Sequence, residues 1–319
     1  MFFQNAYHGL NQWWRWLLTI LLTVLFWLVG HIPLIIFANR EAARLGISDL
    51  DVTKLAIHPD LNRNLFLLLA LIPFVLGFAT LCFLITRLHK KPLRSVMTGR
   101  RRFDWQRAWL GFAVWFLIAV ATTFLFMPAG SYTYQFNPSA FWPLLAIGLL
   151  LIPIQTTLEE VFFRGYLMQG TSLLFRNKIV PFILVTLIFT FMHIANPEFH
   201  TDYTKGFLGY LAVSVLLGIA AVLDDGLEVP CGIHAANNVF AAVVLSTKDG
   251  SFITDSIFAS TLDELMRYSP QLDIGICVVA FLIFSYMFGW RFSTLFEPTV
   301  PLPRPGPGNS DADTVAAER

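Results

Sequence analysis

Long apolar stretches alternate with short polar segments along most of this 319-residue chain. Charge-poor runs of roughly 20 residues match the length of helix that crosses the hydrocarbon core of a bilayer. Eight such runs begin near Leu17, Leu65, Trp109, Phe141, Ile179, Gly206, Cys231 and Ile274. The pattern therefore predicts an all-α fold, a polytopic membrane bundle of about eight transmembrane helices.

The composition agrees with a membrane protein. Hydrophobic residues make up 56% of the chain and charged residues only 13%, whereas soluble domains carry about 25% charged residues. The net charge of +1 gives no sign of nucleic-acid binding, so we expect the lipid bilayer as a partner and no nucleic acid. The three cysteines show no C-x-x-C spacing, and neither disulfides nor a thiolate metal site is predicted.

The same pattern divides the chain into four parts. Residues 1–140 hold three N-terminal transmembrane helices with a basic loop at 87–107, and residues 141–247 hold the central core. Residues 248–296 form a loop and the last transmembrane helix. Residues 297–319 are rich in Pro, Gly and small polar residues, so we expect a disordered tail.

Basic residues predict the orientation of the chain. The loop 87–107 holds eight of the 22 Lys and Arg residues, and the loop after the third helix holds none. Since cytoplasmic loops are enriched in Lys and Arg, we expect a multi-pass protein of the cell (inner) membrane with both termini in the cytoplasm. In that orientation 15 basic residues lie inside and seven outside.

Three ionisable residues follow directly on the apolar run that begins at Phe141. They occur in the segment TTLEEVFFRGY as Glu159, Glu160 and Arg164. A charge at the centre of a spanning helix costs about 2.5–3.5 kcal/mol, so these groups are expected to pair or to line a water-filled cavity. Glu160 and Arg164 have the i, i+4 spacing of an ion pair. Glu159 lies about 100° around the helix and can remain free for chemistry. The alternative is a helix end solvated at the membrane surface.

Two further runs carry isolated polar residues. The fifth run has a single histidine, His193, four residues after Phe189. In the seventh run, His234 and Asn238 share one helix face. Such groups often serve only packing or interhelical hydrogen bonding. A histidine and an asparagine aimed at one point can instead stabilise a developing oxyanion.

Together these residues favour hydrolysis by water. The sequence shows no Ser, Thr or Cys in the setting of a known catalytic nucleophile. Cys231, three residues before His234, is a minor alternative in which a thiol rather than water is the nucleophile. Glu159 is the candidate general base. No cofactor is expected, and the zinc-protease pattern H-E-x-x-H is absent. A zinc ion held by Glu159, His193 and His234 is the alternative.

The order of these motifs resembles a known family. EEVFFR at 159–164, FTFMH at 189–193 and HAANN at 234–238 occur in that order on separate predicted helices. This resembles the CAAX prenyl protease and bacteriocin-processing (CPBP, or ABI) family of intramembrane endopeptidases, over roughly residues 142–245. The resemblance implies an eight-helix type of fold and a metal-free, glutamate-dependent mechanism.

The resemblance also implies roles for individual residues. Glu159 would activate the water and His193 would help to hold it, while His234 and Asn238 would form the oxyanion hole. The pair of Glu160 and Arg164 would support them.

Helix four must then continue past Glu159. To bring Glu159 to the depth of His193, we expect this helix to reach about Met168, with residues 170–178 as the following turn.

The predicted function is an intramembrane endopeptidase that acts on a peptide or a membrane protein. Two other functions fit the same residues. One is a non-catalytic peptide-binding or bacteriocin self-immunity membrane protein. The other is a transporter that uses the charged motif as an ion relay, although the internal repeat typical of many transporters is not evident in the sequence.

Overall fold

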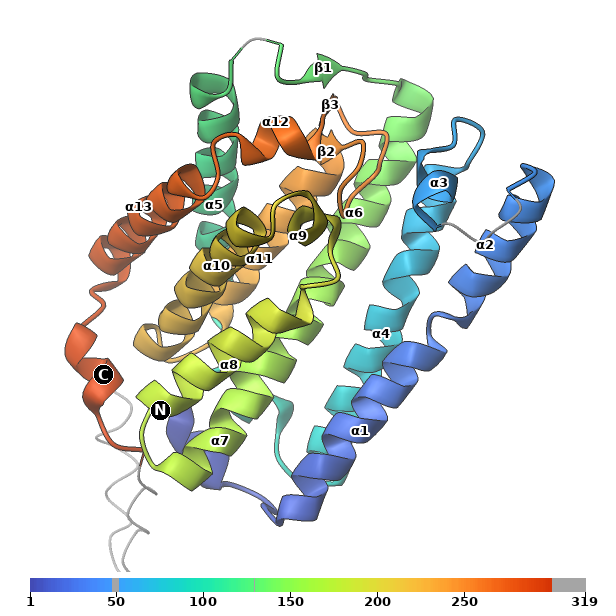
Figure 1. The fold of residues 1–319 in the computed structure, drawn as a ribbon. Helices are drawn as coiled ribbons and strands as arrows, with labels where there is room; N and C mark the ends of the chain where they lie inside the picture. Colours follow the sequence, from blue (N-terminus) through green and yellow to red (C-terminus); the bar gives the residue numbers. More distant parts are fainter. Residues whose placement is uncertain (48–51, 129, 300–319) are drawn as a thin grey trace, which may run out of the picture.

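The computed structural model describes residues 1–47, 52–128 and 130–299. Long helices pack side by side into one bundle, and a very small sheet caps one end of it (Figure 1). The α-helices are α1 (Trp13–Val29), α2 (Ile32–Arg44), α3 (Val52–Ile57), α4 (Arg63–Arg87), α5 (Trp105–Phe126), α6 (Pro138–Glu160), α7 (Met168–Phe175), α8 (Ile179–Met192), α9 (Pro197–Thr201), α10 (Tyr203–Leu223), α11 (Glu228–Val239), α12 (Leu262–Met266) and α13 (Gln271–Phe288). Short 3-10 turns are η1 (Phe3–Tyr7), η2 (Leu93–Val96) and η5 (Phe292–Phe296), and π-helical segments are η3 (Val161–Leu167) and η4 (Phe240–Val244).

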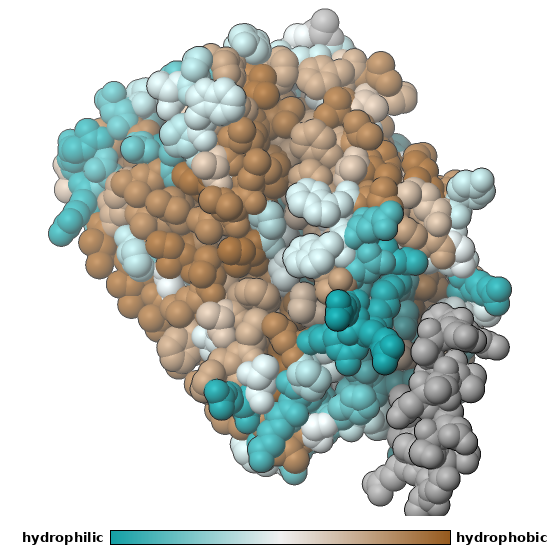
Figure 2. Space-filling model, turned by 180° about the vertical axis from the view of Figure 1, so that it is seen from behind, coloured by the Kyte–Doolittle hydropathy of each residue, from teal (hydrophilic) through white to brown (hydrophobic). Residues whose placement is uncertain are grey.

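The predicted all-α membrane bundle is confirmed. Within the described residues, six helical stretches are long and apolar enough to cross a membrane: Trp13–Arg44, Arg63–Arg87, Trp105–Phe126, Pro138–Phe175, Tyr203–Leu223 and Gln271–Phe288. The two remaining predicted helices are α8 and α11, which are shorter. Apolar side chains cover much of the face in Figure 2, and hydrophilic patches lie towards its edges. The chain is therefore a multi-pass membrane protein.

Polar residues at the ends of the apolar runs set where the long helices begin. The side chains of Asn62, Asp104, Asn137 and Asp202 accept hydrogen bonds from backbone N–H groups in the first turns of α4, α5, α6 and α10. These caps satisfy N–H groups that have no partner inside the helix. Pro138 follows Asn137 at the first helical position of α6, where a missing N–H costs nothing.

The fourth predicted helix extends past Glu159, as expected, and runs further than expected. The π-helical segment η3 follows α6 without a break and leads into α7, so the helix ends only at Phe175. The predicted turn at 170–178 is therefore wrong for residues 170–175, which are helical. The chain turns at 176–178 instead, where Arg176 adopts a left-handed conformation that ends the helix.

Helix α11 lies against α5 and α6 at the centre of the bundle. A Cβ atom at Gly232 of α11 would clash with the carbonyl oxygen of Ala108, and one at Gly111 of α5 would lie 2.8 Å from the carbonyl oxygen of Val229. Only glycine allows the two backbones to approach so closely, as is common between membrane helices. This contact fixes the position of α11.

The two ends of the bundle differ. At one end, β3 (Phe258–Ser260) pairs antiparallel with β1 (Thr133–Tyr134) and parallel with β2 (Leu245–Thr247). Both described chain ends lie at the other end (Figure 1), where the Tyr7 hydroxyl donates to the Thr299 carbonyl oxygen at 2.8 Å. Residues 300–319, most of the tail expected to be disordered, lie outside the described residues.

Candidate active site

A buried ion pair lies where α6 passes into η3. The guanidinium of Arg164 lies 3.0 Å from Oε1 of Glu160, and both side chains are 0% exposed. Arg164 also donates to the Ser214 hydroxyl of α10 at 3.0 Å. The pair predicted from the i, i+4 spacing is therefore present, and it is tied to a second helix.

His234 lies between the two glutamates. Its Nδ1 is 2.7 Å from Oε1 of Glu160, and its Nε2 is 3.6 Å from Oε2 of Glu159. An ionised carboxylate can only accept a hydrogen bond, so Nδ1 carries the hydrogen in this contact. The imidazole is thus held by Glu160 and presents Nε2 towards Glu159.

The two oxygens of Glu159 have different surroundings. Oε1 accepts a hydrogen bond from the Gln155 amide at 3.1 Å. Oε2 is buried and has no hydrogen-bond partner among the described residues. One oxygen therefore fixes the carboxylate, and the other is available for a proton or a water molecule.

Asn238 reaches the same site through Gln155. Its amide Nδ2 lies 3.5 Å from Oε1 of Gln155, and its Oδ1 accepts from Asn237 at 3.1 Å. Gln155 was not predicted from the sequence. Its position four residues before Glu159, on the same helix face, was the available signal.

His193 ends α8 beside this group. Its Nδ1 lies 2.7 Å from the carbonyl oxygen of Phe189. A carbonyl only accepts, so Nδ1 donates and a neutral ring keeps an acceptor at Nε2. The ring stacks on Tyr210 of α10 with centroids 4.9 Å apart, a partner that sequence reasoning missed. Glu159 and His234 lie close enough to His193 to interact with it electrostatically.

Phe189 packs under three of these side chains. Its ring lies 4.0 Å from the Arg164 guanidinium carbon, 4.4 Å from the His193 ring and 5.9 Å from the His234 ring. The Phe189 side chain is only 3% exposed. It therefore forms an apolar floor that links the charged motif to both histidines, with an added cation–π contact to Arg164.

Comparison with known proteins supports the resemblance seen in the sequence. Residues 138–240 match the family model described as type II CAAX prenyl endopeptidase Rce1-like. We call this matched segment the Rce1-like core, because it is similar to that family. The resemblance to CAAX proteases predicted for residues 142–245 is thereby confirmed, and the match runs from α6 to the start of η4.

The Rce1-like core lies in a chain that has a full-length relative. The chain is 28% identical over 295 residues to the uncharacterized protein YyaK of Bacillus subtilis (strain 168), and the match covers 90% of this chain and 95% of YyaK. No solved structure gives a significant match.

The Rce1-like core does not gather a compact set of metal ligands. No three His, Cys, Asp or Glu side chains among the described residues lie together closely enough to hold a metal ion. Nδ1 of His193 and Nδ1 of His234 are each engaged by protein oxygens. Nε2 of each ring is left open, as in histidines that bind a metal through Nε2, so zinc held by Glu159, His193 and His234 stays the alternative to a metal-free mechanism. Cys231, the alternative nucleophile, is 8% exposed.

A charged network fixes the start of α11, the helix that carries His234. Asp224 pairs with Arg100 at 3.2 Å and with Arg107 at 2.5 Å, and it accepts from the Trp290 indole at 2.9 Å. Arg100 also lies 3.2 Å from Glu228, the first residue of α11. Burial raises the pKa of Asp224 even though Arg100 and Arg107 oppose the rise. The network anchors α11 to the basic loop.

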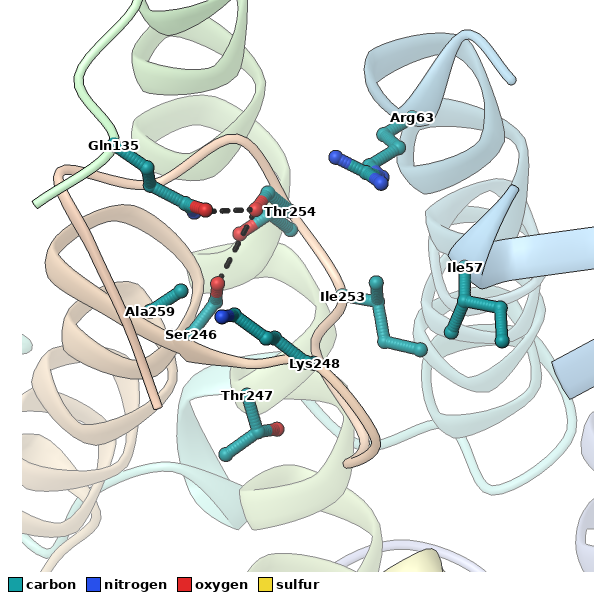
Figure 3. Close-up of a pocket in the computed structure, with 9 residues that line it drawn as sticks. All are labelled: Ile57, Arg63, Gln135, Ser246, Thr247, Lys248, Ile253, Thr254 and Ala259. Atoms are coloured by element: carbon teal, nitrogen blue, oxygen red, sulfur yellow. Dashed lines mark hydrogen bonds between the residues drawn. The ribbon is translucent and has the colours of Figure 1, made fainter. Parts of the chain in front are cut away.

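A separate polar cavity of about 340 Å³ lies at the sheet end of the bundle (Figure 3). It is lined by Ile57, Arg63, Gln135, Ser246, Thr247, Lys248, Ile253, Thr254 and Ala259. Thr254 is central to its wall, because its carbonyl oxygen accepts hydrogen bonds from Gln135 at 3.3 Å and from Ser246 at 3.2 Å. The cavity was not predicted, since its residues come from segments far apart in the sequence.

Proposed function

We propose that this protein is an intramembrane endopeptidase that hydrolyses a peptide bond with water activated by Glu159. One observation carries the proposal. Oε2 of Glu159 is buried and makes no hydrogen bond among the described residues, with Nε2 of His234 at 3.6 Å, while Oε1 is held by Gln155. A carboxylate fixed through one oxygen and free at the other suits a general base.

In this mechanism Glu159 and His193 hold the attacking water. The free oxygen of Glu159 takes one proton as the water attacks the peptide carbonyl, and it gives this proton to the amine nitrogen as the C–N bond breaks. Nε2 of a neutral His193 is an acceptor, because Nδ1 donates to the Phe189 carbonyl. It accepts the second hydrogen of the water and orients it.

His234 and Asn238 form the oxyanion hole. Both residues lie on α11, and each has a donor group that the protein can aim at one point. His234 acts through Nε2, because its Nδ1 is held by Glu160, which in turn pairs with Arg164. Donation from Nε2 to the oxyanion requires that this nitrogen carry a hydrogen.

The substrate is a peptide or a segment of a membrane protein. The site residues lie on helices of a membrane bundle, so the scissile bond must reach them from the membrane or its surface. The basic loop 87–107 and both described chain ends lie together at one end of the bundle, and we place that end in the cytoplasm of a cell (inner) membrane protein.

The test is cleavage of a peptide library by purified protein in detergent. Wild-type protein is compared with Glu159→Gln, which removes the base, and with Glu264→Gln, a matched change in α12 outside the site. We expect cleavage that survives a metal chelator, is lost in Glu159→Gln and persists in Glu264→Gln. Cleavage that the chelator abolishes would contradict the metal-free mechanism. Binding of peptides without cleavage would favour the non-catalytic alternative.

A further inference from the structure

A chain of side-chain hydrogen bonds runs from α5 through α11 to the catalytic carboxylate. The Trp115 indole donates to Oδ1 of Asn237 at 3.3 Å. Asn237 donates to Oδ1 of Asn238 at 3.1 Å, and Asn238 donates to Oε1 of Gln155 at 3.5 Å. Gln155 donates to Oε1 of Glu159 at 3.1 Å. Every link points in the same direction, towards the carboxylate.

The chemistry of the two ends fixes that direction. An indole N–H can only donate, and an ionised carboxylate can only accept. The orientation of an amide is otherwise ambiguous, since its oxygen and nitrogen have nearly the same shape. With a donor at one end and an acceptor at the other, each of the three amides between them has a single orientation that completes the chain.

We propose that Trp115, Asn237 and Gln155 are positioning residues, which act as a one-way hydrogen-bond relay that orients Asn238 and Glu159 for catalysis. The inference rests on the proposed function, because it assumes the roles given there to Asn238 and Glu159. None of the three positioning residues needs to touch the substrate.

For Asn238 the relay decides which group faces the substrate. Its Oδ1 is held by Asn237, and one of its two N–H groups is used by Gln155. The second N–H remains to donate to the oxyanion. If the amide turned over, its oxygen would face the developing negative charge and would repel it. The relay prevents this inversion.

For Glu159 the relay decides which oxygen is the base. Gln155 engages Oε1, and Oε2 makes no hydrogen bond among the described residues and faces Nε2 of His234 at 3.6 Å. Hydrogen bonds in series also polarise one another. A donor as remote as Trp115 therefore contributes to the last link of the relay.

Packing of α5 on α11 makes the first link. Trp115 is 2% exposed and lies one turn after Gly111, the residue at the close contact with Val229 of α11. This contact brings the indole to Asn237. If the Asn237 amide turns over, this buried indole N–H loses its acceptor Oδ1, which adds to the free-energy cost of inversion.

The kinetic test uses Trp115→Phe and Gln155→Met. Each substitution removes the hydrogen-bonding groups and introduces an apolar side chain of related shape. Loss of one buried hydrogen bond corresponds to about a tenfold fall in rate. We expect kcat to fall about tenfold in each variant with little change in KM. Trp109→Phe is the matched control, because Trp109 lies on the same helix and is 65% exposed. Unchanged kcat in folded Trp115→Phe and Gln155→Met would overturn the relay.

A second readout does not depend on activity. The chain has nine Trp residues, and the indole N–H signal of Trp115 in ¹⁵N-Trp-labelled protein is identified by its loss in Trp115→Phe. We expect this signal to move in Gln155→Met and the Trp109 signal to stay. A Trp115 signal that does not move would overturn the relay. If the signal moves but wild-type protein cleaves no peptide, the relay stands and the proposed function fails.

Discussion

His234 and Glu160 are joined by a 2.7 Å hydrogen bond although 74 residues separate them in the chain. The same carboxylate oxygen also pairs with Arg164 at 3.0 Å. Glu160 therefore links α6 to α11 and sets the direction of the imidazole, whereas Glu159 supplies the unpaired oxygen. The two adjacent glutamates should respond differently to substitution.

Glu160→Gln should destabilise the protein by about 3 kcal/mol, because it leaves the buried Arg164 without its counter-charge. Glu159→Gln should abolish cleavage and change stability little, since Oε2 of Glu159 makes no hydrogen bond among the described residues and lies 3.6 Å from Nε2 of His234. Thermal unfolding in detergent measures the first effect, and peptide cleavage measures the second. Equal stability losses in the two variants would refute this division of roles.

Phe189→Leu should lower both stability and kcat. The smaller side chain leaves a gap under Arg164 and His193 and removes the cation–π contact, so we expect a loss of about 1–2 kcal/mol. Phe191→Leu is the control, because Phe191 lies on the same helix and is 51% exposed. Thermal unfolding and peptide cleavage are measured for both variants. An equal loss in Phe191→Leu would contradict a specific role of Phe189 and would indicate that α8 is sensitive to any Phe→Leu change.

His89 makes the protein sensitive to acid. The ring is 0% exposed and bonds to the Leu10 carbonyl and the Tyr166 hydroxyl, and burial lowers the pKa of His89 from 6.5 to about 4. Between pH 6.5 and 4 the unfolded chain takes up a proton that the folded protein does not, so the folded state loses stability as the pH falls. We expect a loss of about 3 kcal/mol from this group by pH 4.

Melting temperatures across this pH range test the prediction, with His89→Gln for comparison. The variant should be less stable at pH 7, because the glutamine replaces a fitted ring. Its stability should nevertheless fall less steeply between pH 6.5 and 4. Parallel pH profiles for the two proteins would exclude His89 as the source of acid sensitivity.

Arg100→Gln should loosen the start of α11. It removes a cation from Asp224 and Glu228, two buried carboxylates, and we expect a loss of about 2–3 kcal/mol. Burial already raises the pKa of Asp224, and removal of the Arg100 charge should raise it further. The loss of stability in the variant should therefore be smaller at pH 5, where the Asp224 carboxyl can take up a proton and become neutral. Arg101→Gln, at an exposed neighbour, should have almost no effect on melting.

The sequence predicts the helices well because their signal is local. Each of the eight apolar runs corresponds to a helix, and the i, i+4 spacing of Glu160 and Arg164 predicts their ion pair. The turn after Glu159 was misplaced, since GTSLLF at 170–175 has turn-forming Gly, Thr and Ser yet continues the helix as α7. Local composition does not reveal that η3 joins the two helices.

The contacts between helices could not be predicted. Gln155, Tyr210 and Asn237 are uncharged residues with no distinctive spacing to their partners on other helices. Trp115 in α5 resembles many tryptophans of membrane proteins, and only the packing of α5 on α11 brings it to Asn237. Side chains acquire such roles from tertiary structure, so a motif search finds the charged residues and misses those that orient them.

The polar content of α11 has a consequence for the biogenesis of the protein. Its 12 residues continue directly into the five residues of η4, and at the α-helical rise this stretch spans about 25 Å, against about 30 Å for the hydrocarbon core. It also carries Glu228, His234 and two asparagines, which disfavour entry into lipid as an isolated segment. We therefore expect this helix to enter the membrane together with its neighbours, after the long helices have formed a protein-lined path for it. We expect the contacts of His234 with the two glutamates to form late, so that a chain whose long helices are correctly inserted can still lack them.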